Sequence, residues 1–194
     1  VSSGISNNLN ENFIDYDSIK NSKVFYTDSS ILDHNGMKSN AAISALKTAN
    51  ENNVTTVFNL HNNYYIETYG AEIISLLPKI DIIIGSAQEG MDLLGKTNIS
   101  DVMSQFLKYS KIVIMTQGKD GALIATKDKS IHISSVADPS KIMDLNGAGD
   151  AFASGFLYGY THNYSLKESG QLGAKASAEI IYQTGARTKT NLKE

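Results

Sequence analysis

The chain has 194 residues, of which 41% are hydrophobic and 19% charged, and its formal net charge is −3 at pH 7. These values are typical of a globular protein, so we expect one domain over residues 1–194. The charge balance imposes no basic face for nucleic acid, and the lack of cysteine excludes disulfides and thiolate metal sites. No apolar run approaches the ~20 residues that span a bilayer, and no signal-peptide pattern is present, so we expect a cytoplasmic protein.

Strands alternate with helices along the chain. The β-forming apolar runs predict strands over Lys23–Asp28 (short and buried), Val54–Leu60, Ile80–Ile84 and Ile112–Thr116, then a hairpin of Gly121–Ala125 and Ser130–Ser134. Helical spacing predicts helices over Ser39–Asn53, Tyr64–Leu77, Gln88–Leu94, Ile99–Tyr109, Gly149–Tyr160 and Leu166–Tyr182. This alternation indicates an α/β fold of three layers, with a mostly parallel sheet between helices.

Polar residues follow several of these strands. Asn59, Ser86 with Glu89, and Thr116 each lie at or just after the carboxyl end of a predicted strand. In open α/β folds, ligands bind beyond this edge of the sheet. We therefore expect the functional groups there.

The most informative stretch is Asp144–Phe152, with the sequence Asp-Leu-Asn-Gly-Ala-Gly-Asp-Ala-Phe, and a predicted helix begins within it. Glycines allow a close backbone approach, and a helix start offers unpaired N–H groups, so the stretch predicts an anion site beside the Asp150 carboxylate. Two simpler explanations exist. An acid in a first helical turn is stabilised by the helix dipole alone, and Gly-x-Gly also opens dinucleotide folds. The second is disfavoured because Phe152 occupies the third-glycine position.

Two other segments support a phosphate-binding protein. Thr116–Gly121 follows a strand, and its glycines allow a tight turn with N–H groups that face phosphate, although a hairpin turn explains Lys-Asp-Gly equally well. Glu89 follows another strand. Taken by itself it is best explained as an ordinary acid at a helix start, although one carboxylate besides nucleotide phosphates would also suffice for magnesium.

These motifs resemble those of the ribokinase-type (PfkB) sugar and nucleoside kinases, over about Lys20 to Arg187. The resemblance implies an anion hole at Gly147, Ala148 and Gly149, with Asp150 as the base. It implies a magnesium acid at Glu89. It also implies nucleotide contacts, from the residues Ser86, Thr116, Gly118, Lys119, Gly121, Asn146 and Gly149. Ser86 replaces the family's asparagine, and Leu145 replaces its usual threonine.

The closing Gln183–Arg187 and the Phe58–Leu60 and Leu77–Gly85 segments resemble adenosine kinases in particular. The resemblance implies a nucleotide-binding α/β domain that transfers the γ-phosphoryl of ATP to a nucleoside, with Mg²⁺ and a monovalent cation near the carbonyls of Asp144 and Asn146. A sugar as substrate is the first alternative. A non-catalytic nucleotide-binding relative, suggested by Ser86, and a nicotinamide oxidoreductase are others. We expect a monomer or homodimer. Because the chain opens with Val1, we also expect an upstream segment, and the resemblance implies that this segment carries a lid and much of the acceptor pocket.

Overall fold

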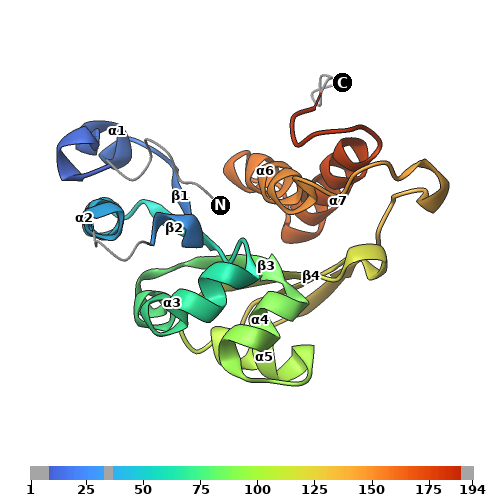
Figure 1. The fold of residues 1–194 in the computed structure, drawn as a ribbon, viewed down its shortest axis with the longest axis horizontal. Helices are drawn as coiled ribbons and strands as arrows, with labels where there is room; N and C mark the ends of the chain where they lie inside the picture. The colour runs from blue at the N-terminus through green and yellow to red at the C-terminus, as the bar shows by residue number, and fades with distance from the viewer. Residues whose placement is uncertain (1–8, 33–36, 189–194) are drawn as a thin grey trace. The chain divides into compact units, whose positions relative to one another are not determined.

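The computed structural model describes residues 9–32 and 37–188, drawn as a ribbon in Figure 1. These residues fall into two compact units. Among the described residues, unit 1 comprises residues 9–32, 37–84 and 88–113, and unit 2 comprises residues 85–87 and 114–188. Across the described residues, no helix is both long and apolar enough to cross a membrane.

Within the described residues, six strands form one sheet, in the order β1-β2-β3-β4-β5-β6. Their bounds are β1 Val24–Asp28, β2 Thr55–Asn59, β3 Ile82–Ser86, β4 Ile112–Thr116, β5 Ala122–Ala125 and β6 Ser130–Ile133. The pairs β1–β2 and β2–β3 are parallel, with Val57 opposite both Tyr26 and Ile82. The pair β5–β6 is an antiparallel hairpin. The predicted mostly parallel sheet and its terminal hairpin are therefore confirmed.

Each predicted helix is present, with small shifts at its ends. The helices are α1 Tyr16–Lys20, α2 Met37–Glu51, α3 Asn63–Leu76, α4 Ala87–Leu94, α5 Ile99–Phe106, α6 Ala148–Thr161 and α7 Leu166–Ile181. Short 3₁₀ turns cover Glu11–Phe13, Ser29–Ile31, Leu77–Lys79, Gly118–Asp120 and Pro139–Lys141. Of the elements in the part of the chain that the structure describes, only α1 and the 3₁₀ turns lack a counterpart among the predicted elements. In α1, too few residues are available to show an apolar repeat.

The core of unit 1 follows from the apolar runs of β2 and β3. Val57, Phe58 and Ile82 to Ile84 are almost entirely shielded from solvent, as expected for strands covered on both faces. By contrast, the prediction that β1 is buried is wrong. Within β1 only Thr27 is buried, and Tyr26 is 38% exposed. The physical reason is position, because β1 is the first strand in the order and pairs with β2 alone among the described strands.

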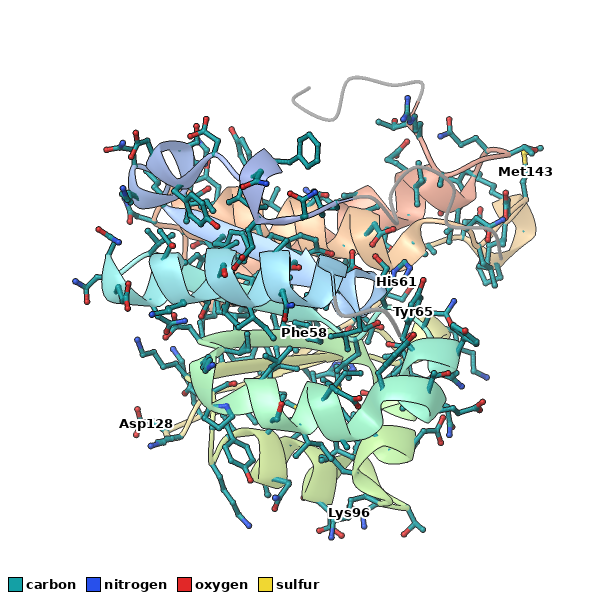
Figure 2. All side chains as sticks on the ribbon, turned by 60° about the vertical axis from the view of Figure 1, so that its left-hand side comes forward. Phe58, His61, Tyr65, Lys96, Asp128 and Met143 are labelled. Carbon is teal, nitrogen blue, oxygen red and sulfur yellow. The ribbon has the colours of Figure 1, made fainter. Side chains whose placement is uncertain are left out.

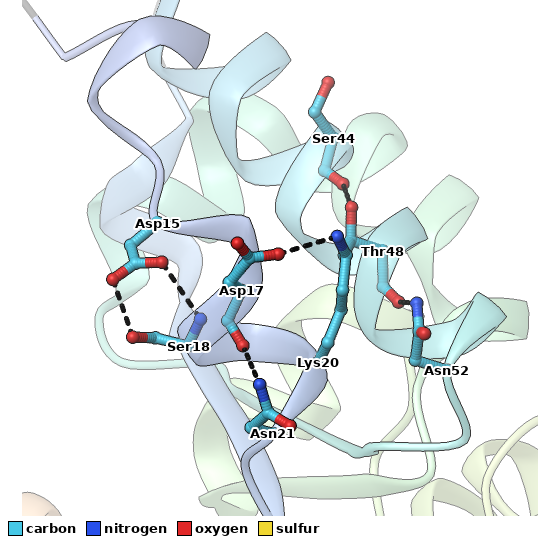
Figure 3. A network of polar contacts seen from close by, with 8 residues as sticks. All are labelled: Asp15, Asp17, Ser18, Lys20, Asn21, Ser44, Thr48 and Asn52. Atoms are coloured by element: carbon cyan, nitrogen blue, oxygen red, sulfur yellow. Dashed lines mark hydrogen bonds and ion pairs between the residues drawn. The ribbon is translucent and has the colours of Figure 1, made fainter.

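Local polar contacts define α1 and the exposed side of α2 (Figure 3). The carboxylate of Asp15 caps α1 by accepting the Ser18 N–H at 2.9 Å. Lys20 pairs with Asp17 one turn earlier, at 2.9 Å. Such exposed contacts specify where a short helix begins and ends, but contribute little to global stability.

The Asp81 carboxylate makes several polar contacts near the start of the unit 1 strands. The Oδ2 atom of Asp81 accepts the Thr56 N–H at 2.9 Å, and its Oδ1 atom pairs with Lys111 Nζ at 2.8 Å. Partial burial raises the pKa of Asp81, but the contacts from Lys111 and Thr56 outweigh it, so the pKa lies below its ordinary value. Asp81 thereby joins the residues that precede or open β2, β3 and β4.

In unit 2, α6 and α7 pack with their backbones in close approach. A methyl group on Gly155 would lie 2.6 Å from the Leu172 carbonyl oxygen, and one on Gly173 would lie 2.8 Å from that of Phe152. Helix α7 begins with a capping box between Ser165 and Glu168. The two glycines therefore fix how closely α6, the helix after the predicted anion turn, can sit against α7.

Candidate functional site

The predicted anion turn is the first turn of α6. Gly147 is its N-cap, with φ 81° and no side-chain cap. The Ala148 N–H donates to the Leu145 carbonyl at 3.2 Å, whereas the N–H groups of Gly149 and Asp150 have no acceptor within the described residues. Gly149 and Asp150 are also exposed. The turn therefore presents two free N–H donors and one carboxylate to solvent, at the positive end of a 14-residue helix.

The two glycines of this turn differ in whether the backbone conformation and the neighbouring residues require a glycine. Gly147 has a left-handed φ, and a Cβ added there would lie 2.9 Å from the Ala186 Cβ. Gly149 lies outside the left-handed range, and a Cβ there would meet nothing within 4 Å among the described residues. The fold therefore explains Gly147 but not Gly149. Open space above a glycine in a first helical turn is what the close approach of a ligand needs.

The turn is held from behind by the closing loop, which we define as Gln183–Arg187. The carboxylate of Asp144 accepts the Asn146 N–H and the Gly185 N–H, each at 3.0 Å. These two backbone donors, Asn146 first and then Gly185, place the pKa of Asp144 below its ordinary value. The carboxylate thus links the residues before the turn to those after α7.

The predicted nucleotide loop, Thr116–Gly121, is also a turn with free N–H groups. Gly118 and Gly121 take φ 58° and 87°, and the Gln117 N–H donates to the Gly121 carbonyl at 2.7 Å. Within the described part of the chain, the N–H groups of Gly118 and Lys119 have no acceptor. The segment connects β4 to β5, as a plain turn would, but it also offers two donors in a row, which suits an anion. The Lys119 side chain is exposed.

Thr116 and Ser86 occupy the carboxyl ends of β4 and β3. Both residues are half-buried, and the Thr116 hydroxyl donates to the Gly85 carbonyl across a long 3.4 Å. The structure therefore brings the predicted Ser86 and Thr116 segments together within unit 2. Asn146 lies beside Asp144, with its N–H occupied by that carboxylate and its side chain exposed.

Glu89 lies in the first turn of α4 and is half-buried. It belongs to unit 1, whereas the other predicted site residues belong to unit 2. Among the described residues, no group of three or more His, Cys, Asp or Glu side chains could hold a metal ion. A single carboxylate fits magnesium delivered with nucleotide phosphates, and would not fit a metal held by protein ligands alone.

An aromatic cluster follows β2, although its tyrosines look like ordinary packing residues in the sequence. His61 and Tyr65 lie next to each other at the start of α3, with ring centroids 6.2 Å apart (Figure 2). Tyr65 also contacts Tyr64 edge-on at 5.2 Å and stacks with Tyr69 at 6.2 Å. The i, i+4 spacing of Tyr65 and Tyr69, directly after a strand, is the signal that could have revealed it.

Asn59, predicted as a polar residue at the carboxyl end of a strand, orders the turn that leads from β2 to this aromatic cluster. It is 5% exposed, and its amide donates to the Tyr26 hydroxyl at 2.9 Å. Its carbonyl oxygen accepts the His61 N–H at 3.2 Å, where His61 takes a left-handed φ of 67°. The polar groups of Asn59 therefore have internal partners, and the side chain orders a turn.

Comparison with known proteins identifies the family. The pfkB family carbohydrate kinase model matches residues 3–193, so the chain belongs to this family. The 5-dehydro-2-deoxygluconokinase of Clostridium beijerinckii is 32% identical over 185 residues, which are 89% of this chain and 53% of that protein. The adenosine kinase of Dictyostelium discoideum is 30% identical over 162 residues, 75% of this chain and 46% of that protein. The chain thus spans about half the length of these curated relatives.

Solved structures agree on the fold. A probable sugar kinase of Rhizobium etli CFN 42, 27% identical, superposes with a TM-score of 0.90 over 95% of this chain and 56% of that one. The adenosine kinase of Sinorhizobium meliloti, 25% identical, gives the same TM-score and coverage. The predicted three-layer, ribokinase-like α/β fold is therefore confirmed.

Proposed function

We propose that the protein is an ATP-dependent kinase that transfers the γ-phosphoryl group to a hydroxyl of a nucleoside or sugar. The observation that carries the proposal is the first turn of α6. It offers the free N–H groups of Gly149 and Asp150, an exposed carboxylate, and a glycine that the fold does not require. Phosphoryl transfer needs such donors because its transition state spreads negative charge over the phosphoryl oxygens.

In the proposed reaction Asp150 accepts the proton of the acceptor hydroxyl. The hydroxyl oxygen forms a bond to the γ-phosphorus as the bond from that phosphorus to the β,γ-bridging oxygen breaks, and ADP leaves with the electron pair. The N–H groups of the anion turn hold the phosphoryl oxygens, and those of Gly118 and Lys119 bind other phosphates of the nucleotide. Ser86, Thr116, Gly121 and Asn146 complete the proposed nucleotide contacts.

Glu89 is the proposed magnesium ligand, directly or through water, and the ion when bound neutralises phosphate charge. We expect Glu89→Gln to raise the magnesium concentration needed for half-maximal rate, because an amide binds this hard cation more weakly than a carboxylate. A magnesium titration at saturating ATP measures it. Asp92→Asn, which changes an exposed acid of the same helix, is the control. An unchanged titration for Glu89→Gln would favour the simpler helix-start role.

For the acceptor, we propose an adenosine-like nucleoside, with a sugar second. The support for a nucleoside comes from Phe58–Leu60, Leu77–Gly85 and Gln183–Arg187, the segments that resemble adenosine kinases. Relatives named adenosine kinase, nucleoside kinase and 5-dehydro-2-deoxygluconokinase leave both classes open. A monovalent cation near the carbonyls of Asp144 and Asn146 and a cytoplasmic location belong to the same proposal.

The test is ADP formation from Mg-ATP with adenosine, other nucleosides, ribose and fructose, using the full-length protein. We expect turnover with at least one acceptor, and a fall of ~10²–10⁴ in Asp150→Asn, the usual contribution of a positioned general base. Nucleotide affinity of the variant should change little. ATP binding without turnover on any acceptor would instead support a non-catalytic relative. Near-normal turnover of Asp150→Asn would remove the base from the proposal.

A further inference from the structure

The Asp144 carboxylate bridges two segments that are far apart in sequence. One oxygen accepts the N–H of Asn146, the residue before Gly147, and the other accepts the N–H of Gly185, 41 positions away. Each contact is 3.0 Å long, and both donors are backbone groups. The carboxylate therefore holds the start of the anion turn and the closing loop at a fixed separation.

Backbone contacts anchor the same two segments to the end of α7. The N–H groups of Met143 and Asp144 donate to the Ile181 carbonyl, at 2.8 and 3.3 Å. Within the closing loop, the Gln183 amide donates to the Arg187 carbonyl at 2.6 Å. The closing loop is thus ordered by its own contacts, and Asp144 is the side chain that transmits its position to the turn.

The closing loop also forms a wall behind the turn. A Cβ on Gly147 would lie 2.9 Å from the Ala186 Cβ and 3.0 Å from its Cα, so the Gly147 backbone is packed directly against Ala186. Gly147 immediately precedes the helical residues whose N–H groups would bind the proposed anion. A displacement of the closing loop would therefore redirect the donors of Gly149 and Asp150.

We propose that Asp144 is a positioning residue for phosphoryl transfer, which acts by holding the anion turn against the closing loop. This inference rests on the proposed kinase function. Asp144 itself need not touch the nucleotide or the acceptor. Its effect on rate would arise because oxyanion donors must lie close to their productive geometry, and a displacement of about 1 Å can cost ~10²-fold.

Asp138 provides a matched control within the same unit. Like Asp144 it is half-buried, and its carboxylate accepts the N–H of the residue two positions on, Ser140, at 3.0 Å. Its other side-chain partners are the Ser140 hydroxyl at 2.7 Å and Lys141 at 3.6 Å, so the carboxylate does not reach the closing loop. Its backbone N–H donates to the Tyr182 hydroxyl, a contact that a side-chain substitution retains.

The first experiment compares kcat and KM for Asp144→Ala, Asp144→Asn and Asp138→Ala in the full-length protein. We expect kcat of Asp144→Ala to fall by about 10- to 100-fold, with a smaller change in KM for ATP, because the donors act mainly on the developing charge. Asp144→Asn should recover part of the loss, since its amide oxygen still accepts an N–H. Asp138→Ala should stay within about twofold of wild type. Equal kcat values for Asp144→Ala and Asp138→Ala would overturn the inference.

The second experiment separates this inference from the kinase proposal. Hydrogen exchange is measured at the N–H groups of Ala148 and Ala151, which donate to Leu145 and Gly147 rather than to Asp144. We expect exchange about tenfold faster in Asp144→Ala and unchanged in Asp138→Ala, because the turn opens locally when its link to the closing loop is lost. If Asp144→Ala exchanges faster but the wild-type protein has no kinase activity, the kinase proposal alone is rejected. Unchanged exchange would reject the role of Asp144.

Discussion

Unit 2 contains two turns, Gln117–Gly121 and Gly147–Asp150, that each present two free N–H groups and each contain two glycines. Within each turn the two glycines have different reasons to be there. In each turn one glycine is required by the fold. A Cβ on Gly121 would lie 1.9 Å from the Ile133 carbonyl oxygen, and one on Gly147 would lie 2.9 Å from Ala186. The other glycine of each turn, Gly118 or Gly149, has nothing within 4 Å of a Cβ among the described residues.

This difference separates structural glycines from candidates for ligand contact. Gly121 and Gly147 have a left-handed φ and a neighbouring backbone, so their lack of a side chain is explained without a ligand. Gly118 has a left-handed φ of 58° alone, and Gly149 has neither requirement. Gly149 is therefore the position where function, rather than folding, best explains a glycine.

The largest effect is expected at Gly121. Gly121→Ala should destabilise the protein by about 4 kcal/mol or more, because its methyl group cannot coexist with the Ile133 carbonyl. Gly118→Ala is the control, and should cost only the ~1–2 kcal/mol of a left-handed φ. Urea unfolding of both variants measures the difference. Similar midpoints for the two would show that β6 yields easily and would weaken the distinction drawn above.

At Gly149 stability and activity should change in opposite directions. Gly149→Ala should leave the free energy of unfolding unchanged or raise it by up to ~1 kcal/mol, because alanine is the better helix former. Turnover should nevertheless fall at least about tenfold, since the methyl group occupies the approach to the N–H donors. Gly147→Ala, by comparison, should lose stability as well as activity. A fully active Gly149→Ala variant would contradict the assignment of this turn as the anion site.

A smaller effect is expected at Asp81, which serves unit 1 much as Asp144 serves the anion turn. Asp81→Asn should cost about 1–2 kcal/mol at pH 7 by weakening the contacts to Thr56 and Lys111. Folding lowers the pKa of Asp81, so its contribution is present above the ordinary value of 3.8 and is lost as pH falls through the folded pKa. The stability gap between wild type and variant should therefore shrink below about pH 4. A gap that stays constant in urea unfolding from pH 6 to pH 3 would show that charge is not its cause.

Most of the fold could be predicted from the sequence because the central strands are nearly pure apolar runs. Ile82–Ile84 and Ile112–Met115 have no polar side chain, and both are buried. The β1 strand is also rich in β-forming residues, yet it is largely half-buried. Its β-formers predict a strand but not its burial, because burial depends on how many neighbours a strand has in the sheet.

The site could be predicted only where one continuous stretch carries the chemistry. Asp144–Phe152 combines its glycines, its acid and its helix start within nine residues, so the sequence was enough to predict an anion turn there. The role of Asp144 could not be found this way, because its partner Gly185 is 41 positions away. The contact of Gly147 with Ala186 is hidden from sequence for the same reason.

The close approach of α6 and α7 has a consequence for protein engineering. A methyl group on Gly155 or Gly173 would strike the backbone of the facing helix, and one on Gly159 would strike Ser169. Surface complementarity of this kind is a property of the helix pair, because neither helix can change its contact face alone. A chimera that borrows α6, and with it Asp150, from another member of the family should therefore borrow α7 from the same parent.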